Sequence, residues 1–262
     1  MLVAKKRRVT KNQRKKAIKK QLQYIKRNLE TIEKIVSDVG LKRLSRRYHR
    51  LLLVVTEVNR QQLYMYENNQ NRIDDRIVSL TQPHIRPIVR GKAGTSVEFG
   101  AKLSASCVNG YVFLDRISWN NFNESGDLIS QVEEFKKYTG AYPESVHADK
   151  IYRTKVNHAW CKEKGIRLSG VRLGRPPKNI SKETKKQARL DEAVRNCIEG
   201  KFGEAKRRFS LNRVMTKLAN TSETAIAISF LVMNLSALLR QFFVYFYVHF
   251  KFQHFPPIFM LL

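Results

Sequence analysis

Acidic residues are scarce in this sequence. Its 262 residues include 22 Asp and Glu against 50 Lys and Arg, which leaves a formal net charge of +28. The imbalance is steepest in residues 1–30, where Glu30 is the one acid beside 12 Lys and Arg. Such an excess points to a polyanionic partner, with nucleic acid first and an anionic membrane surface or a ribosome as alternatives.

Cysteine is also scarce, and its spacing is irregular. Cys107, Cys161 and Cys197 lie far apart in the sequence and form no CxxC pair. This spacing argues against a structural zinc site and against a disulfide framework. A reduced, cytosolic protein is the simplest interpretation.

The sequence lacks both a signal peptide and an uninterrupted membrane span. The N-terminal stretch MLVAKKRRVTKNQRKK has no apolar core. Residues 241–262 are apolar and aromatic, but His249, Lys251 and two prolines, Pro256 and Pro257, interrupt them. They fall short of the roughly 20 consecutive apolar residues of a membrane helix. We therefore expect no stable membrane association, with a transmembrane helix as the minor alternative.

The N-terminal region predicts a pair of helices. Residues 10–38 place isoleucines and leucines at intervals of three and four from Ile18 to Ile35, which is typical of one apolar helix face. A second helix is expected at 42–66, and the two favour an antiparallel hairpin. The Lys and Arg on the other faces form either a solvated surface or a surface for DNA phosphates, and the scarcity of acids favours DNA.

Further along the chain, short apolar segments alternate with helical ones. Strands are expected at 76–80, 97–104, 111–119, 145–148 and 166–169, and helices at 124–138, 154–164, 182–208 and from 222 to at least 240. Asn109-Gly110 is a typical hairpin turn, whereas 82–94 and 170–181, rich in Pro and Gly, are expected to be loops. This order predicts an α/β fold in which helices cover a mixed sheet.

Asp149 directly follows the strand expected at 145–148. Open α/β sheets bind ligands at the carboxyl ends of their strands, and a carboxylate there can bind Mg²⁺. An Asp in this position is more often a helix N-cap. The residue alone therefore leaves both interpretations open.

Arg195, Glu199 and Lys206 are spaced four and seven residues apart, which places them on one face of the helix expected at 182–208. Glu199 could then complete a metal site, with the two cations holding phosphates beside it. The alternative is an intrahelical Arg195–Glu199 ion pair on a wet surface. Spacing alone favours this alternative.

The pattern R-x3-E-x6-K formed by these three residues resembles the signature around the catalytic Glu of bacterial insertion-sequence transposases, whose DDE domain is ribonuclease-H-like. Glu192 replaces the Tyr that usually stands three residues before the Arg. Other segments resemble the same group in the same order: RPIVRGKAGTSVEFGAKLS, GYVFLDRISWNNFNES, HADKIYRTKVNHAWCKEKGIRLSG, LGRPPK and EGKFGEAKRRFSLNRVMTKL. The resemblance covers roughly residues 10–240.

The resemblance implies a catalytic site in which two Asp and one Glu hold two Mg²⁺ (or Mn²⁺) ions for attack on DNA phosphodiesters. Its second Asp corresponds to Asp149 and its Glu to Glu199, both as catalytic residues and as metal ligands. The residues implied for DNA contact are Arg195, Lys206, Arg207, Arg90, Lys92, Arg175 and Lys178. The implied partners are double-stranded DNA, as transposon ends and target, and a second copy in a homodimer, in the bacterial cytoplasm at the nucleoid.

The first Asp of this triad has no evident counterpart. In the group that the sequence resembles, it lies on a strand before the basic helical region, and this sequence starts at that region. We therefore expect an N-terminal truncation. Asp74, Asp75 and Asp115 are the nearby substitutes, although a solvated or capping role suits them better, and Glu204 is a weaker competitor for the role of Glu199.

These observations predict a basic helical hairpin at 1–70, a ribonuclease-H-like DDE core at 71–240 without its first strand, and an atypical apolar tail at 241–262. The predicted function is transposition by metal-dependent phosphodiester hydrolysis and strand transfer, in a copy that the missing Asp leaves inactive. The alternative is a non-catalytic basic DNA-binding remnant that interferes with an intact transposase.

Overall fold

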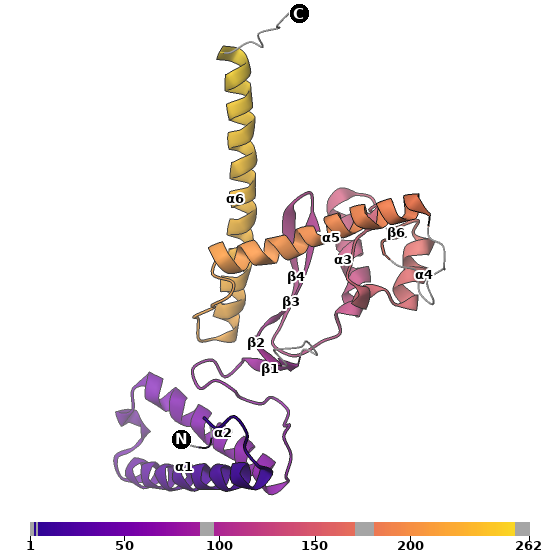
Figure 1. The fold of residues 1–262 in the computed structure, drawn as a ribbon. Helices are drawn as coiled ribbons and strands as arrows, with labels where there is room; N and C mark the ends of the chain where they lie inside the picture. The colour runs from indigo at the N-terminus through magenta and orange to yellow at the C-terminus, as the bar shows by residue number, and fades with distance from the viewer. Residues whose placement is uncertain (1–2, 4, 90–96, 171–180, 255–262) are drawn as a thin grey trace, which may run out of the picture. The chain divides into compact units, whose positions relative to one another are not determined.

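The structure of the protein, a computed structural model, describes residues 3, 5–89, 97–170 and 181–254. It divides into two compact units, residues 1–101 and residues 102–262. Figure 1 labels most of the helices and strands of each unit.

The first unit begins with the predicted helical hairpin. Its elements are α1 (Lys11–Val39), the 3₁₀ turn η1 (Leu41–Arg43), α2 (Arg46–Glu67), β1 (Arg86–Val89) and β2 (Val97–Gly100). Helix α1 starts at Thr10, whose hydroxyl accepts a hydrogen bond from the Gln13 amide in a capping box. It ends at Gly40, where φ is 77°, a conformation that favours glycine. Helix α2 then packs back against α1.

Two sequence-based predictions in this unit are wrong. Strand β1 lies within residues 82–94, which were expected to form a loop, and pairs antiparallel with β2. The strand predicted at 76–80 is absent. Buried Gln61 occupies the backbone there: its side-chain amide donates to the Asp75 carbonyl (3.2 Å) and accepts from the Ile77 amide (2.9 Å). These contacts take the place of strand pairing.

The second unit contains β3 (Lys102–Val108), β4 (Tyr111–Ser118), η2 (Glu124–Gly126), α3 (Asp127–Thr139), β5 (Ser145–Val146), η3 (Lys150–Tyr152), α4 (Lys155–Glu163), β6 (Arg167–Leu168), α5 (Lys182–Arg208) and α6 (Ala219–His254). The predicted turn between β3 and β4 is confirmed, because Asn109 and Gly110 both have positive φ angles. The strand predicted at 97–104 is instead split, since β2 pairs with β1 and β3 pairs with β4.

A small apolar core lies beneath Asp149. Its buried members are Leu128, Val132, Cys161 and Ile166, contributed by α3, α4 and the start of the β6 segment. Ala148 packs against this cluster, and β5 and β6 pair in parallel. The strand predicted at 145–148 is limited to Ser145–Val146, and Asp149 follows its carboxyl end after two further residues.

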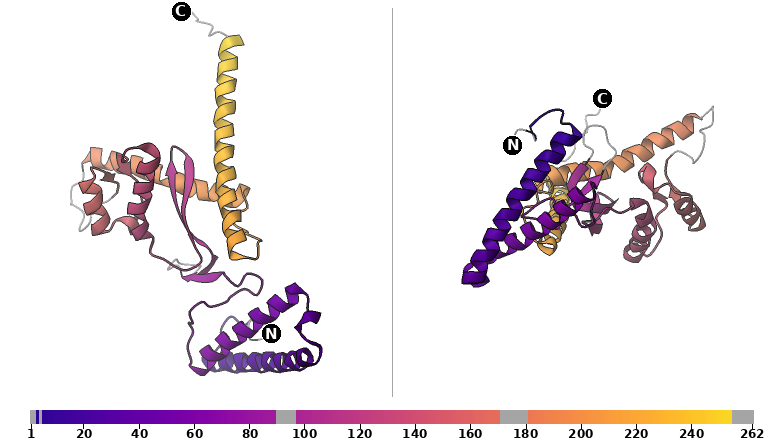
Figure 2. Two further views of the ribbon diagram at one scale, coloured as in Figure 1. Left: turned by 180° about the vertical axis from the view of Figure 1, so that it is seen from behind. Right: turned by 90° about the horizontal axis from the view of Figure 1, so that it is seen from below.

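Helix α6 begins as part of the fold and continues beyond it. It buries Ile226, Phe230 and Met233, and the Asn234 side chain makes two hydrogen bonds to the backbone of Val112 on β4 (2.7 and 2.9 Å). The helix then runs on past these contacts, as the left view of Figure 2 shows. It is long and apolar enough to cross a membrane, judged by length and composition alone.

The structure combines helices and strands, which agrees with the predicted α/β class. The strands of the described residues make three two-stranded sheets, flanked by helices, rather than one continuous sheet. A ribonuclease-H-like sheet and the domain boundaries near residues 70 and 240 stay predictions.

Candidate functional site

Helix α5 carries most of the candidate site. It starts at Ser181, whose hydroxyl accepts a hydrogen bond from the Thr184 amide (3.2 Å). From there α5 is continuous over the predicted residues 182–208. The basic and acidic residues singled out in the sequence therefore do lie on one helix, at the spacing of a common face.

The Arg195 guanidinium joins two carboxylates that lie 50 residues apart in the sequence. Its Nη1 donates to Glu199 Oε1 at 2.7 Å and lies 3.5 Å from Asp149 Oδ1. Because both oxygens contact one nitrogen, they are at most 6.2 Å apart, the sum of the two contacts. Two oxygens that bind one Mg²⁺ ion lie within about 4.2 Å of each other, a separation that this upper bound allows.

Glu192, which departs from the expected Tyr, binds the other side of Arg195. Its carboxylate accepts hydrogen bonds from Nε (3.1 Å) and Nη2 (2.6 Å). Hydrogen bonds that Arg195 donates to Glu192 and Glu199 raise the pKa of Arg195, and these bonds in turn lower the pKa of Glu192. The departure from the family pattern thus supplies an anchor for the guanidinium, a role that the sequence did not reveal.

The two candidate metal ligands face solvent. Their side chains are 70% exposed for Asp149 and 62% for Glu199, against 17% for Arg195. Asp149 stands at the N-cap position of η3, as the alternative interpretation expects, but its side chain makes no capping hydrogen bond. The neighbouring His147 is turned to Ser145 (3.0 Å) and Asp191 (3.6 Å) instead. The Asp149 and Glu199 carboxylates are therefore accessible to a cation or a phosphate.

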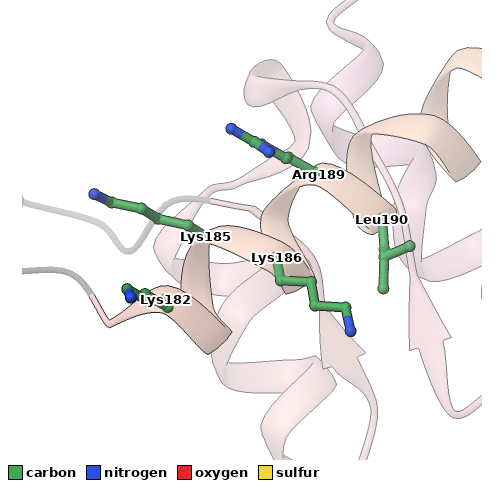
Figure 3. A pocket seen from close by; sticks show the side chains of 5 residues that line it. All are labelled: Lys182, Lys185, Lys186, Arg189 and Leu190. Carbon is green, nitrogen blue, oxygen red and sulfur yellow. The ribbon is translucent and has the colours of Figure 1, made fainter.

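The first turns of α5 present a second group of polar side chains. Figure 3 shows Lys182, Lys185, Lys186 and Arg189 around a shallow hollow, with Leu190 beside them. All four basic residues are exposed, and intervals of three and four place them on one face. Such a row of positive charges suits the phosphate oxygens of a nucleic acid. The spacing was readable in the sequence, yet these residues were not among the predicted contacts.

The predicted DNA contacts are only partly within the described residues. Lys206 and Arg207 are exposed near the end of α5. The other four basic residues predicted from the two loops lie outside the described residues: Arg90, Lys92, Arg175 and Lys178. Their role in DNA binding stays a prediction.

Comparison with protein families bears on this site directly. Residues 146–236 match a family described as Transposase DDE domain. The matched segment runs from β5 into α6 and includes Asp149, Arg195 and Glu199. Over these residues the chain is similar to the DDE-class transposases. Comparisons with curated proteins and with solved structures gave no match.

Within the described ranges, no third metal-ligating side chain is grouped with Asp149 and Glu199. In the part of the chain that the structure describes, no three His, Cys, Asp or Glu side chains are grouped to hold a metal ion. Asp75, with φ of 52°, is paired with Arg86 at 3.5 Å in the first unit. Asp74 is exposed in the turn before it.

Asp115 is engaged on β4, where the sequence placed it. Its carboxylate accepts hydrogen bonds from the Ser106 hydroxyl (3.3 Å) and from the Gln131 amide (2.8 Å). Burial by the surrounding atoms raises the pKa of Asp115, although part of the side chain still meets solvent. These partners account for Asp115 without a metal.

Glu204 differs from Glu199 in its partners. It accepts hydrogen bonds from Arg208 (3.2 Å) and from Arg240 of α6 (2.9 Å), and it is only 18% exposed. The ion pair with Arg240 is the main cause of its lowered pKa. Glu204 therefore links α5 to α6, whereas Glu199 contacts Arg195 beside Asp149.

The structure also brings together two cysteines that the sequence gave no reason to pair. Cys107 on β3 and Cys197 on α5 lie 3.7 Å apart, measured between their sulfurs, and both are free thiols. Burial, with a smaller contribution from Cys197, raises the pKa of Cys107 to about 11. The pair marks where the middle of α5 approaches β3.

Proposed function

We propose that this protein is a transposase that acts on double-stranded DNA, with Asp149 and Glu199 as two of the carboxylates for metal-dependent phosphodiester hydrolysis and strand transfer. The observation that carries the proposal is their common contact with Arg195, which joins a strand end to the middle of α5. A ribonuclease-H-like core is the fold we propose around them, and the bacterial cytoplasm, at the nucleoid, is the proposed location.

The donor set fits Mg²⁺ or Mn²⁺ as a partly hydrated ion. Mg²⁺ is commonly held by one or two carboxylates together with substrate phosphates, and Asp149 and Glu199 offer two. When bound, such an ion polarises a phosphoryl oxygen and lowers the pKa of water. If the two acids held such an ion, the Arg195 guanidinium would be free to bind a phosphate with its planar fork, and its hydrogen bonds to Glu192 would keep it oriented.

A second candidate function is favoured by the missing third acid. No three-carboxylate group is present among the described residues, and a two-metal site that loses one carboxylate loses charge and geometry together. On this second proposal the chain binds DNA without cutting it and competes with an intact transposase for the same DNA.

One pair of measurements on the full chain separates the two candidates. Nicking of a supercoiled plasmid is followed in Mg²⁺ and in Mn²⁺ for wild type, for Glu199→Gln and for Glu204→Gln as the matched control on the same helix. Binding to a short duplex is followed by fluorescence anisotropy from roughly 50 to 200 mM salt, a range over which phosphate contacts weaken steeply.

The first candidate predicts that wild type and Glu204→Gln nick the plasmid and that Glu199→Gln does not. The second predicts steeply salt-dependent binding in all three, without nicking in any. Binding that is absent, or that does not change with salt, contradicts both candidates.

A further inference from the structure

The outward face of α6 carries an exposed apolar stripe. Ile228, Leu235 and Phe242 recur every seven residues, as do Leu231, Leu238 and Tyr245, and the residue after each of the latter is apolar as well. All nine side chains are between 42% and 70% exposed. A seven-residue apolar repeat over three heptads is typical of the seam along which two helices pair.

The opposite face of the same helix is already occupied. Ile226 and Met233, and likewise Phe230 and Ala237, also lie seven residues apart, and all four are buried within their own unit. Phe230 meets Phe202 of α5 edge-to-face, with ring centroids 5.9 Å apart. The outward stripe is therefore not needed for the packing of α6 on its own chain.

We propose that this stripe docks against the same stripe of a second copy, so that α6 pairs with α6 in a homodimer. Nine apolar side chains that each expose on the order of 100 Å² offer roughly 900 Å² per copy. A stable interface needs about 800 Å² from each partner. The stripe thus has the area that a dimer requires, provided that most of it is buried.

The charge distribution agrees with this partner. Between Ile228 and Phe246 the only charged residue is Arg240, and Glu204 of the same chain binds it at 2.9 Å. Two copies can therefore approach along the stripe without placing unpaired charges in the seam. Repulsion between the two net charges of +28 acts from elsewhere on the surface, and salt screens it.

Lipid is the rival occupant. From Phe242 to Val248 the helix is apolar on every side, with Val244 and Tyr247 also exposed, which suits a bilayer as well. A bilayer, however, imposes no seven-residue period. The repeat also begins at Ile228, level with the turns whose other side packs on the protein and whose Asn234 is bonded to β4. The observations therefore favour a second copy.

Molar mass by sedimentation equilibrium tests the proposal on the full chain. The stripe variant is Leu235→Glu with Leu238→Glu, and the matched control is Val244→Glu with Tyr247→Glu. All four positions are exposed, so the variants add equal charge without opening the core, and far-ultraviolet circular dichroism checks that both keep their helix content. Flotation with anionic vesicles is measured in parallel.

The expected result is a dimer for wild type and for the control, and a monomer for the stripe variant, with the dimer dissociation constant raised at least about 100-fold. A monomeric wild type overturns the proposal, as does an equal loss of dimer in both variants. Vesicle binding that only the control pair abolishes, with no dimer in any sample, assigns the segment to lipid instead. Because mass is read independently of plasmid nicking, this result does not depend on the proposed DNA chemistry.

Discussion

Two acids on the same face of α5, eight residues apart, each pair with an arginine but differ in their surroundings. Asp191 is 7% exposed and accepts two hydrogen bonds from Arg167 (2.8 and 2.9 Å). Glu199, about two turns further along the helix, is 62% exposed and shares Arg195 with Asp149. An acid–arginine pair is therefore no sign of function by itself. Exposure, and a second acid on the same guanidinium, make the difference.

The largest expected effect concerns Cys107, which marks how closely β3 approaches α5. Only the thiolate reacts with iodoacetamide. Because burial raises the pKa of Cys107 from 9.0 to about 11, we expect alkylation at pH 8 to be roughly 100-fold slower than for an ordinary thiol. The rate should still rise between pH 9 and pH 10. Peptide mass spectrometry measures it, and alkylation at the speed of free cysteine would show that this contact is open.

Stability measurements test whether Asp191 and Glu199 differ in their contribution to folding. Asp191→Asn removes the charge of the buried carboxylate that binds Arg167. We therefore expect a loss of about 1–3 kcal/mol in the free energy of unfolding. Glu199→Gln, at an exposed position, should change it by less than about 0.5 kcal/mol. Urea unfolding of the two variants measures both values. Equal losses in the free energy of unfolding would contradict the difference in burial between Asp191 and Glu199.

The ion pair between Arg167 and Asp191 predicts that the stability of the fold depends on pH. Hydrogen bonds from Arg167 lower the pKa of Asp191 in the folded chain below its unfolded value. The stabilisation is therefore present above the unfolded pKa, near pH 4, and is lost as the pH falls through the folded value. Wild type and Asp191→Asn should converge in stability at low pH, whereas a constant difference would argue against this ion pair.

The sequence predicted those elements that local periodicity defines. Helices α1 and α5 match the expected ranges closely, since apolar spacing and capping residues act within a few turns. The strand expected at 76–80 failed because Gln61, from an earlier helix, takes the backbone bonds. Strand β1 was missed because its Pro87 and the glycines after it are typical of a loop.

In the candidate site, too, one part was predicted from the sequence and another was not. The resemblance singled out Asp149, Arg195 and Glu199, and the structure brings these three together. The contact of Cys107 with Cys197 spans 90 residues and leaves no local pattern. No sequence rule gives such long-range contacts, because they depend on how the elements pack.

The smallest expected effect is on DNA affinity and concerns the basic residues in the first turns of α5. Replacing Lys185, Lys186 and Arg189 with Gln removes up to three phosphate contacts, so DNA affinity should fall about 10-fold at moderate salt, and the slope of log affinity against log salt should flatten by up to about 3. The matched control replaces three exposed lysines of α3 and α4, Lys137, Lys155 and Lys162. If fluorescence anisotropy finds equal losses of DNA affinity in both sets, these residues contribute only through the net charge of the protein.

The central claim, that Asp149 and Glu199 share a metal ion, is tested most directly by the Mn²⁺ affinity of the full chain, read from the electron paramagnetic resonance of free Mn²⁺. Asp149→Ala and Glu199→Ala should each weaken binding, and Glu204→Ala should leave it unchanged. Arg195→Gln should tighten it, because a cation now in contact with both carboxylates is removed. Unchanged Mn²⁺ affinity in both Asp149→Ala and Glu199→Ala would contradict the account.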